Sequence, residues 1–96
     1  MAGPEKIFED KVKAYLESKG AWYVKYWGGG LYTKRGVPDI LVCYKGRFIA
    51  VEAKADNGRP SELQLHQIKK IQEAGGIAMV LYPKDFDDFK KMIEKL

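Results

Sequence analysis

The chain has 96 residues, of which 46% are hydrophobic and 31% are charged, a balance typical of one globular domain and not of a disordered segment. No apolar run approaches the roughly 20 residues of a membrane-spanning helix, and the first residues lack the pattern of a signal peptide. The formal net charge of +4 favours a polyanionic partner without demanding one.

Cys43 is the only cysteine, so the chain cannot form an internal disulfide. A reducing compartment suits such a chain, and we expect a cytoplasmic protein. Because Cys43 lies in an apolar run, we expect it in the core. No repeat or linker divides the sequence, and we expect residues 1–96 to form a single domain.

The first 36 residues predict a helix, a strand and a loop. Residues 5–19 repeat apolar side chains at helical spacing, and Gly20 is a natural stop. Residues 21–27 alternate as a strand does, which predicts that one pair of its four aromatic residues is buried and the other exposed, where it could serve dimerisation. Residues 28–36 form a glycine-rich loop, in which Lys34 and Arg35 are candidates for contacts with DNA phosphates.

The remaining residues predict three strands and two helices. Residues 38–44 and 47–55 are strands joined by a hairpin turn at Lys45-Gly46. Ser61 caps a helix that runs to about residue 74. Residues 77–82 form a short strand, whose apolar pattern argues against an edge position, and residues 85–95 form the last helix. The order αβββαβα predicts an α/β fold with a mixed sheet flanked by helices, because the helix before the fourth strand provides a crossover.

The third predicted strand carries a charged pair. Side chains of a strand alternate between its faces, so residues 49, 51, 53 and 55 form an apolar face that would pack on a core. Glu52 and Lys54 share the opposite face within an apolar run, where an unpartnered charge is costly. A solvated strand face is the alternative interpretation of this pair.

Asp39 follows Gly36-Val-Pro at the start of the preceding strand, where glycine and proline shape the backbone and aim the carboxylate. Two carboxylates brought together repel unless one is protonated or a cation lies between them. Oxygen ligands of this kind suit Mg²⁺ or Mn²⁺, and no Cys/His set for zinc exists. With Lys54 to polarise water or steady a phosphate, these residues suit metal-assisted phosphodiester hydrolysis. A turn-forming role is the alternative for Asp39.

Pro38-Asp39, followed after twelve residues by Glu52-Ala53-Lys54, resembles the signature of the PD-(D/E)XK nucleases. The fuller set of Gly36-Val-Pro-Asp39, Ser61-Glu-Leu-Gln64 and Gly75-Gly76 resembles the VRR-NUC (virus-type replication-repair nuclease) family. The likeness runs from residue 5 to about residue 82, and the small size resembles the stand-alone members carried by bacteriophages. The resemblance implies the PD-(D/E)XK restriction-endonuclease-like core for the whole chain.

The resemblance also implies roles for individual residues. Asp39, Glu52 and the backbone carbonyl of Ala53 would bind the divalent metal, Mg²⁺ with Mn²⁺ as a substitute. Lys54 would be the catalytic base or electrostatic partner, and Gln64 would hold water or phosphate near the metal. An acid of the first helix completes the family's site; Glu9 and Glu5 are both candidates, and we favour Glu9 as a catalytic residue and further metal ligand because it lies nearer the helix centre.

Resemblance to the stand-alone members implies a homodimer that cuts branched DNA in the manner of a Holliday-junction resolvase. The cytoplasm would be that of the host if the chain is phage-encoded. Two alternatives are a structure-specific or nicking endonuclease without junction preference and a weakly catalytic DNA-binding module. Intact Asp39, Glu52 and Lys54 argue against the second, since a pure binder does not need clustered acids facing DNA.

Overall fold

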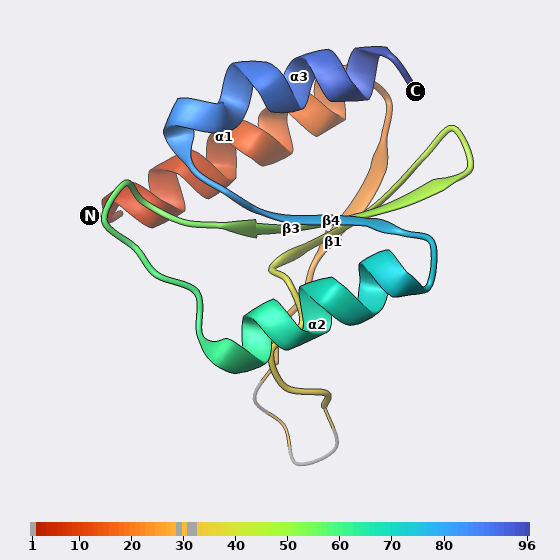
Figure 1. The fold of residues 1–96 in the computed structure, drawn as a ribbon. Coiled ribbons are helices and arrows are strands. Elements are labelled where there is room, and N and C mark those ends of the chain that lie inside the picture. The colour runs from red at the N-terminus through yellow and green to blue at the C-terminus, as the bar shows by residue number, and fades with distance from the viewer. Residues whose placement is uncertain (1, 29, 31–32) are drawn as a thin grey trace.

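The structure is a computed structural model and describes residues 2–28, 30 and 33–96 (Figure 1). Its elements follow the predicted order αβββαβα, with boundaries within two residues of the predicted ones. They are α1 (Pro4–Ser18), β1 (Trp22–Lys25), β2 (Ile40–Tyr44), β3 (Arg47–Ala53), α2 (Glu62–Glu73), β4 (Ile77–Leu81), the 3-10 helix η1 (Pro83–Asp85) and α3 (Phe86–Glu94). Residues 29, 31 and 32 of the predicted glycine-rich loop lie outside the described residues.

The four strands form one mixed sheet in the order β1-β2-β3-β4. β2 pairs antiparallel with both β1 and β3, and β4 pairs with β3 in parallel after the crossover through α2. Lys45 and Gly46 both have positive φ, as the tight hairpin between β2 and β3 requires. The prediction that β4 avoids the edge is wrong: among the described strands β4 pairs only with β3. Its apolar side chains are covered by helices on the two faces, which shields an edge strand as well as a central one.

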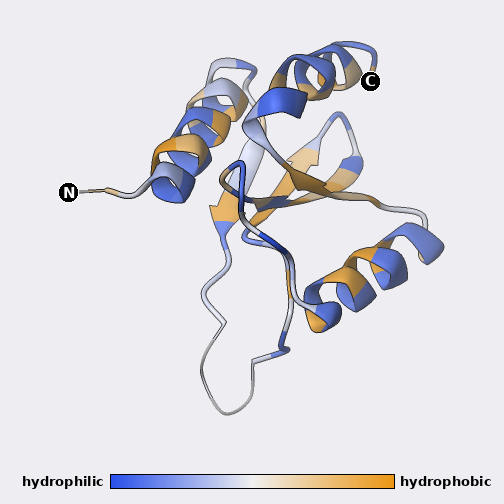
Figure 2. Ribbon diagram, turned by 60° about the vertical axis from the view of Figure 1, so that its left-hand side comes forward, coloured by the Kyte–Doolittle hydropathy of each residue, from blue (hydrophilic) through white to orange (hydrophobic). Residues whose placement is uncertain are grey.

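The helices cover the sheet unequally (Figure 1). α1 and α3 lie on one face, where the main core gathers their apolar side chains over Ile49, Val51 and Ala53 of β3. α2 lies on the other face and packs on β4 and β3 around Ile68 and Ala50. The alternation predicted for β3 is therefore confirmed. Figure 2 shows mostly hydrophobic strands between helices that mix hydrophobic and hydrophilic residues, as amphipathic helices on a sheet do.

The face that carries α2 is less covered toward the hairpin end of β2. Cys43, predicted to lie in the core, is exposed there instead, because its side chain points to the α2 side of the sheet, where the α2 cluster includes Leu41 of β2 but not Cys43. The predicted division of the aromatic residues is only partly met: Trp22 is 65% and Trp27 79% exposed, but Tyr23 and Tyr26 are half-buried and not buried. The strand ends at Lys25, so its alternation does not extend to Tyr26 and Trp27. No helix in the described part of the chain is long and apolar enough to cross a membrane.

Candidate active site

Asp39, Glu52 and Lys54 meet at one end of the sheet. The register pairs Ile40 of β2 with Val51 of β3, so the next residues along, Asp39 and Glu52, face each other across the strands. The ammonium of Lys54 lies 3.5 Å from Oε2 of Glu52. Residues far apart in sequence thus present two carboxylates and an ammonium at the same place, as the sequence predicts.

The Glu52 side chain is buried but incompletely paired. Only 1% of the residue is exposed, and Nε2 of Gln64 donates a hydrogen bond of 3.1 Å to Oε2. The other carboxylate oxygen, Oε1, is buried and accepts no hydrogen bond from the described residues. Burial, together with the nearby negative charge of Asp39, raises the pKa of Glu52 to about 7 although Lys54 opposes the rise. A buried oxygen without a donor, beside a second carboxylate, is a site that attracts a cation.

The donors at this site fit a hard divalent cation. Asp39 and Glu52 supply carboxylate oxygens, and the backbone carbonyl of Ala53 lies between Glu52 and Lys54 at the end of β3. Mg²⁺ is commonly held by one or two carboxylates and completes its shell with water, so a larger protein cage is unnecessary. The described residues contain no cluster of three or more His, Cys, Asp or Glu side chains that could hold a metal.

Two acids of α1 reach the site from different directions. Glu9 is only 4% exposed, and its carboxylate pairs with Lys13 at 3.2 Å and, more closely, with Lys25 of β1. Burial raises the pKa of Glu9, but hydrogen bonds from Lys25 and Lys13 outweigh it and hold the pKa below its ordinary value. Glu5 is half exposed and lies 3.9 Å from Lys54. Glu9 is the better fixed of the two candidates.

Lys25 is a site residue that the motifs do not indicate. Its ammonium lies between Glu9 and Asp39, 3.7 Å from Oδ1 of Asp39, and so links α1 to the carboxylate at the start of β2. The register places Lys25 opposite Ile40, next to Asp39. An antiparallel pairing of the first two predicted strands that brings the end of the first beside the Gly-x-Pro-Asp sequence would have predicted Lys25 next to Asp39.

Gln64 is anchored at the start of α2. Its backbone N–H donates to Oγ of Ser61, and its side-chain Oε1 accepts from the Ser61 backbone N–H at 2.8 Å, which forms a capping box. Its side-chain amide nitrogen, Nε2, donates a hydrogen bond to Oε2 of Glu52. The sequence predicts Gln64 at the site; the structure adds that the same side chain caps the N-terminus of α2 and orients the Glu52 carboxylate.

The Gly36-Val-Pro-Asp39 sequence fits the backbone that it occupies. Gly36 has φ +78°, and a Cβ atom built there would lie 2.7 Å from the Leu63 carbonyl oxygen, so no side chain fits between this loop and α2. Pro38 is fully buried and leads into β2. These contacts press the loop against α2 and fix the point from which Asp39 projects.

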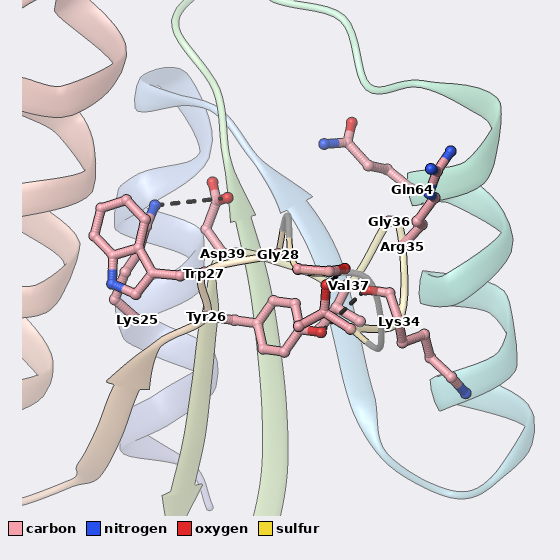
Figure 3. A pocket seen from close by; sticks show the side chains of 12 residues that line it. Lys25, Tyr26, Trp27, Gly28, Lys34, Arg35, Gly36, Val37, Asp39 and Gln64 are labelled. Carbon is pink, nitrogen blue, oxygen red and sulfur yellow. Dashed lines mark hydrogen bonds and ion pairs between the residues drawn. The ribbon is translucent and has the colours of Figure 1, made fainter.

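A pocket of about 520 Å³ opens beside these acids (Figure 3). Its lining comes from the end of β1, the following loop and α2, and it includes Asp39, Gln64 and the predicted DNA-binding residues Lys34 and Arg35. Figure 3 shows the ion pair of Lys25 with Asp39 on one side of the pocket in this view and Gln64 on the other. Both Lys34 and Arg35 are exposed, so their charges are available to a ligand that enters from solvent.

Comparisons with known proteins identify a matching family and a similar structure. The family described as archaeal Holliday junction resolvase (Hjc) matches residues 5–81. Among solved structures, Hjc of Archaeoglobus fulgidus, a Holliday junction resolvase from an archaeal hyperthermophile, is similar with a TM-score of 0.60 and 21% identity. The match covers 80% of this chain but 66% of that protein, slightly less than two thirds of its length. A search of curated proteins finds no significant match.

The two matches bear on different predictions. The structural likeness confirms the predicted α/β fold, a mixed four-stranded sheet flanked by helices. The family match supports the PD-(D/E)XK superfamily, whereas the narrower resemblance to VRR-NUC nucleases of bacteriophages stays a prediction. Since the matched residues span most of the sequence and include the whole site, this chain belongs to the archaeal Holliday junction resolvase family of nucleases.

Proposed function

We propose that this chain is a divalent-metal-dependent endonuclease that cuts branched DNA, with a four-way junction as its preferred substrate. The observation that carries the proposal is the buried Glu52 carboxylate, whose Oε1 has no donor among the described residues and which faces Asp39 and Lys54. A structural carboxylate would be expected to have its oxygens paired. Membership of a resolvase family supports the choice of substrate.

We propose that Asp39, Glu52 and the carbonyl of Ala53 hold Mg²⁺, for which Mn²⁺ would substitute. The bound ion would neutralise charge on the scissile phosphate and lower the pKa of water. The fit rests on the donor chemistry of these residues and on the unpartnered oxygen of Glu52. Glu9 is a further candidate ligand, although its carboxylate is engaged with lysines.

The residues around the acids would act on the phosphate and on the attacking water. As an ammonium, Lys54 would steady the developing charge on the phosphate; as the neutral amine, it would take a proton from the attacking water. Its Nζ lies beside Glu52, which supports either role at this site. Gln64 keeps Glu52 in position by its hydrogen bond. Lys25 would keep Glu9 and Asp39 from repelling each other. Lys34 and Arg35 would contact the DNA backbone along the pocket.

Symmetric resolution of a junction requires two related active sites, and one chain of 96 residues offers a single one. We therefore propose a homodimer. The resemblance to stand-alone VRR-NUC nucleases leads us to propose a phage-type enzyme formed by one domain, residues 1–96, that acts in the host cytoplasm.

Two alternatives differ in what they cut. A nicking or structure-specific endonuclease would use the same acids without preferring a junction. A weakly catalytic DNA-binding module would use the positive charge alone. The raised pKa of Glu52 favours the enzymes over the module, because a carboxylate with such a pKa is costly to keep ionised without a cation.

The substrate is tested with end-labelled four-way junction, flap and linear duplex of the same sequence, each incubated with Mg²⁺ and with EDTA. We expect paired, symmetric nicks in the junction with Mg²⁺ and no cutting in EDTA. Equal cutting of flap or duplex would favour the endonuclease without junction preference. Binding of all three without any cutting would favour the DNA-binding module.

The metal site is tested by titration calorimetry with Mg²⁺ in the absence of DNA. We expect Asp39→Asn to weaken the affinity at least about tenfold, because it removes one of two carboxylates from the site. Asp10→Asn, which changes an exposed acid of α1, is the matched control and should bind like the unchanged protein. A Mg²⁺ affinity of Asp39→Asn equal to that of the unchanged protein would show that Asp39 does not bind the metal.

A further inference from the structure

Trp27 is a large apolar side chain that packs in neither core of the described chain. It is 79% exposed, more than any other large apolar residue that the structure describes. Tryptophan is highly buried on average, because its ring carries a large apolar area. An indole that the fold leaves so open is available to a ligand.

The backbone next to Trp27 is fixed relative to the acids. The N–H of Tyr26 donates a hydrogen bond of 2.7 Å to the carbonyl oxygen of Asp39, and the Tyr26 hydroxyl donates to the Lys34 carbonyl at 3.0 Å. The Trp27 ring lies against the Lys25 ammonium, with 5.2 Å between Nζ and the ring centroid. Because a cation is attracted to the face of an indole, this contact orients the ring. Trp27 is therefore exposed and yet held in place.

The indole lies at the rim of the pocket beside the acids (Figure 3). Trp27 and Asp39 both line this pocket, and the Lys25 ammonium that contacts the ring also lies 3.7 Å from Oδ1 of Asp39. These contacts keep the ring within a few nucleotide steps of the acid. A DNA strand whose phosphate reaches the acids would bring a neighbouring nucleotide to Trp27.

The charge of the pocket selects the kind of partner. Its lining includes Lys25 and the exposed Lys34 and Arg35, and among its described residues Asp39 is the only acid. A second copy of a chain with a net charge of +4 would meet like charge here. Nucleic acid combines phosphates, which pair with the cations, with flat rings, which stack on an aromatic side chain. It fits both properties of this rim.

We infer that Trp27 stacks on an open base face of the DNA close to the scissile phosphate. In an intact duplex each base covers its neighbours and separating them costs free energy, whereas a branch point presents base pairs with one open face. Stacking there would favour branched over linear DNA without reading sequence, because every base has a π face. The inference rests on the proposed function in taking DNA as the ligand, and it adds the feature of the DNA that is recognised.

The chain has two tryptophans, so fluorescence can test the contact directly, in EDTA to prevent cutting. Trp22→Phe leaves Trp27 as the only tryptophan. Trp27→Phe leaves Trp22, which is 65% exposed at the start of β1, as the matched control. We expect a saturating four-way junction to quench at least about half of the Trp27 emission and less than about a tenth of the Trp22 emission. A long linear duplex, which has few open base faces, should quench Trp27 much less.

Binding in EDTA gives a second measurement. We expect Trp27→Ala to bind the junction at least about fivefold more weakly than the unchanged protein and to bind the long duplex within about twofold of it. Trp27→Phe keeps an aromatic ring and should bind the junction within about threefold. Leu65→Ala truncates a half-exposed apolar residue of α2 outside the pocket lining, and as the control it should bind both DNAs like the unchanged protein.

The inference is overturned if the junction leaves the Trp27 emission unchanged, or if Trp27→Ala binds the junction as tightly as the unchanged protein. Equal losses of affinity for junction and long duplex would also overturn it, because the ring would then contact any DNA. Trp27 emission that shifts with protein concentration alone would place the ring between copies of the chain and contradict the inference as well.

These outcomes are separate from those for the proposed function. A chain whose Trp27 is quenched by a junction that it does not cut with Mg²⁺ would contradict the function alone. A chain that cuts junctions without any change in Trp27 emission would contradict the inference alone. A chain that binds no DNA would contradict both.

Discussion

Glu52 is held where its negative charge is costly. The side chain is buried, Asp39 faces it, and one hydrogen bond from Gln64 leaves Oε1 without a donor among the described residues. The pKa of about 7 means that folding favours the protonated form of this carboxyl. An acid with a raised pKa stabilises the folded chain below its unfolded pKa, near 4.5, and that contribution is lost as the pH rises through about 7.

We therefore expect Glu52→Gln to stabilise the protein in EDTA. The gain in the free energy of unfolding should be about 1 kcal/mol at pH 5 and grow to about 3 kcal/mol at pH 8, because the Glu52 carboxyl ionises over this range and the glutamine amide does not. Denaturant unfolding at the two pH values measures it. Glu62→Gln, on the exposed first turn of α2, is the control and should change stability little at either pH. A loss of stability at pH 8 would show that the Glu52 charge is already well paired.

Lys25 shows the opposite case, a charge whose removal should destabilise the fold. Lys25→Met leaves the buried Glu9 carboxylate with Lys13 and the exposed Lys6, and removes the cation between Glu9 and Asp39. We expect a loss of about 2–3 kcal/mol at pH 7, which is less than for a buried acid left alone because Lys13 remains. Lys6→Met, which removes a half-exposed partner, should cost less than about 1 kcal/mol.

The pH dependence of this loss follows from the lowered pKa of Glu9. An acid whose pKa is lowered on folding stabilises the folded chain above its unfolded pKa, which is near 4.5 for Glu9. This stabilisation is lost as the pH falls through the pKa of the folded state. The difference between Lys25→Met and the unchanged protein should therefore shrink when thermal unfolding is repeated near pH 3. A difference that is equal at both pH values would mean that Lys25 acts through packing and not through the Glu9 charge.

At the scale of elements, the loop before β2 is held against α2 by the close approach of Gly36 to Leu63. Gly36→Ala meets both a positive φ and a carbonyl oxygen at 2.7 Å, whereas Gly46→Ala meets a similar φ of +76° with no atom within 4 Å. We expect Gly46→Ala to cost about 1–2 kcal/mol and Gly36→Ala at least about 3 kcal/mol, since only the second adds a clash. Chemical denaturation of the two variants checks this. Equal costs would mean that the loop moves away from α2 easily.

The elements themselves were largely predictable, because each has a local signal. Ser61 and Gln64 mark the start of α2, Lys45-Gly46 marks the hairpin, and alternation in β3 separates the two faces of the sheet. The edge position of β4 was not predictable in this way. An apolar strand covered by helices on both faces has the same pattern at the edge and in the centre, so pairing order has to come from the fold.

At the scale of the whole molecule, the sequence predicts the acids and Lys54 but not the residues that support them. Lys25 enters the site through the pairing of β1 with β2, and a lysine in an alternating strand carries no sign of that pairing. Cys43 was placed wrongly for a related reason: its apolar neighbours suggest burial, whereas the position of α2 leaves its side of the sheet less covered toward the hairpin end of β2. What the sequence lacks in both cases is the relative placement of elements.

The central claim is that Asp39, Glu52 and Lys54 form one hydrolytic site, and Lys54→Ala tests it most directly. Single-turnover cleavage of a labelled four-way junction and binding of the same junction in EDTA are measured together, with Lys70→Ala as the control for an exposed lysine of α2. We expect cleavage by Lys54→Ala to fall at least about 100-fold while its affinity for the junction changes less than about threefold. Cleavage within about tenfold of the unchanged rate, with Lys54 absent, would contradict the account.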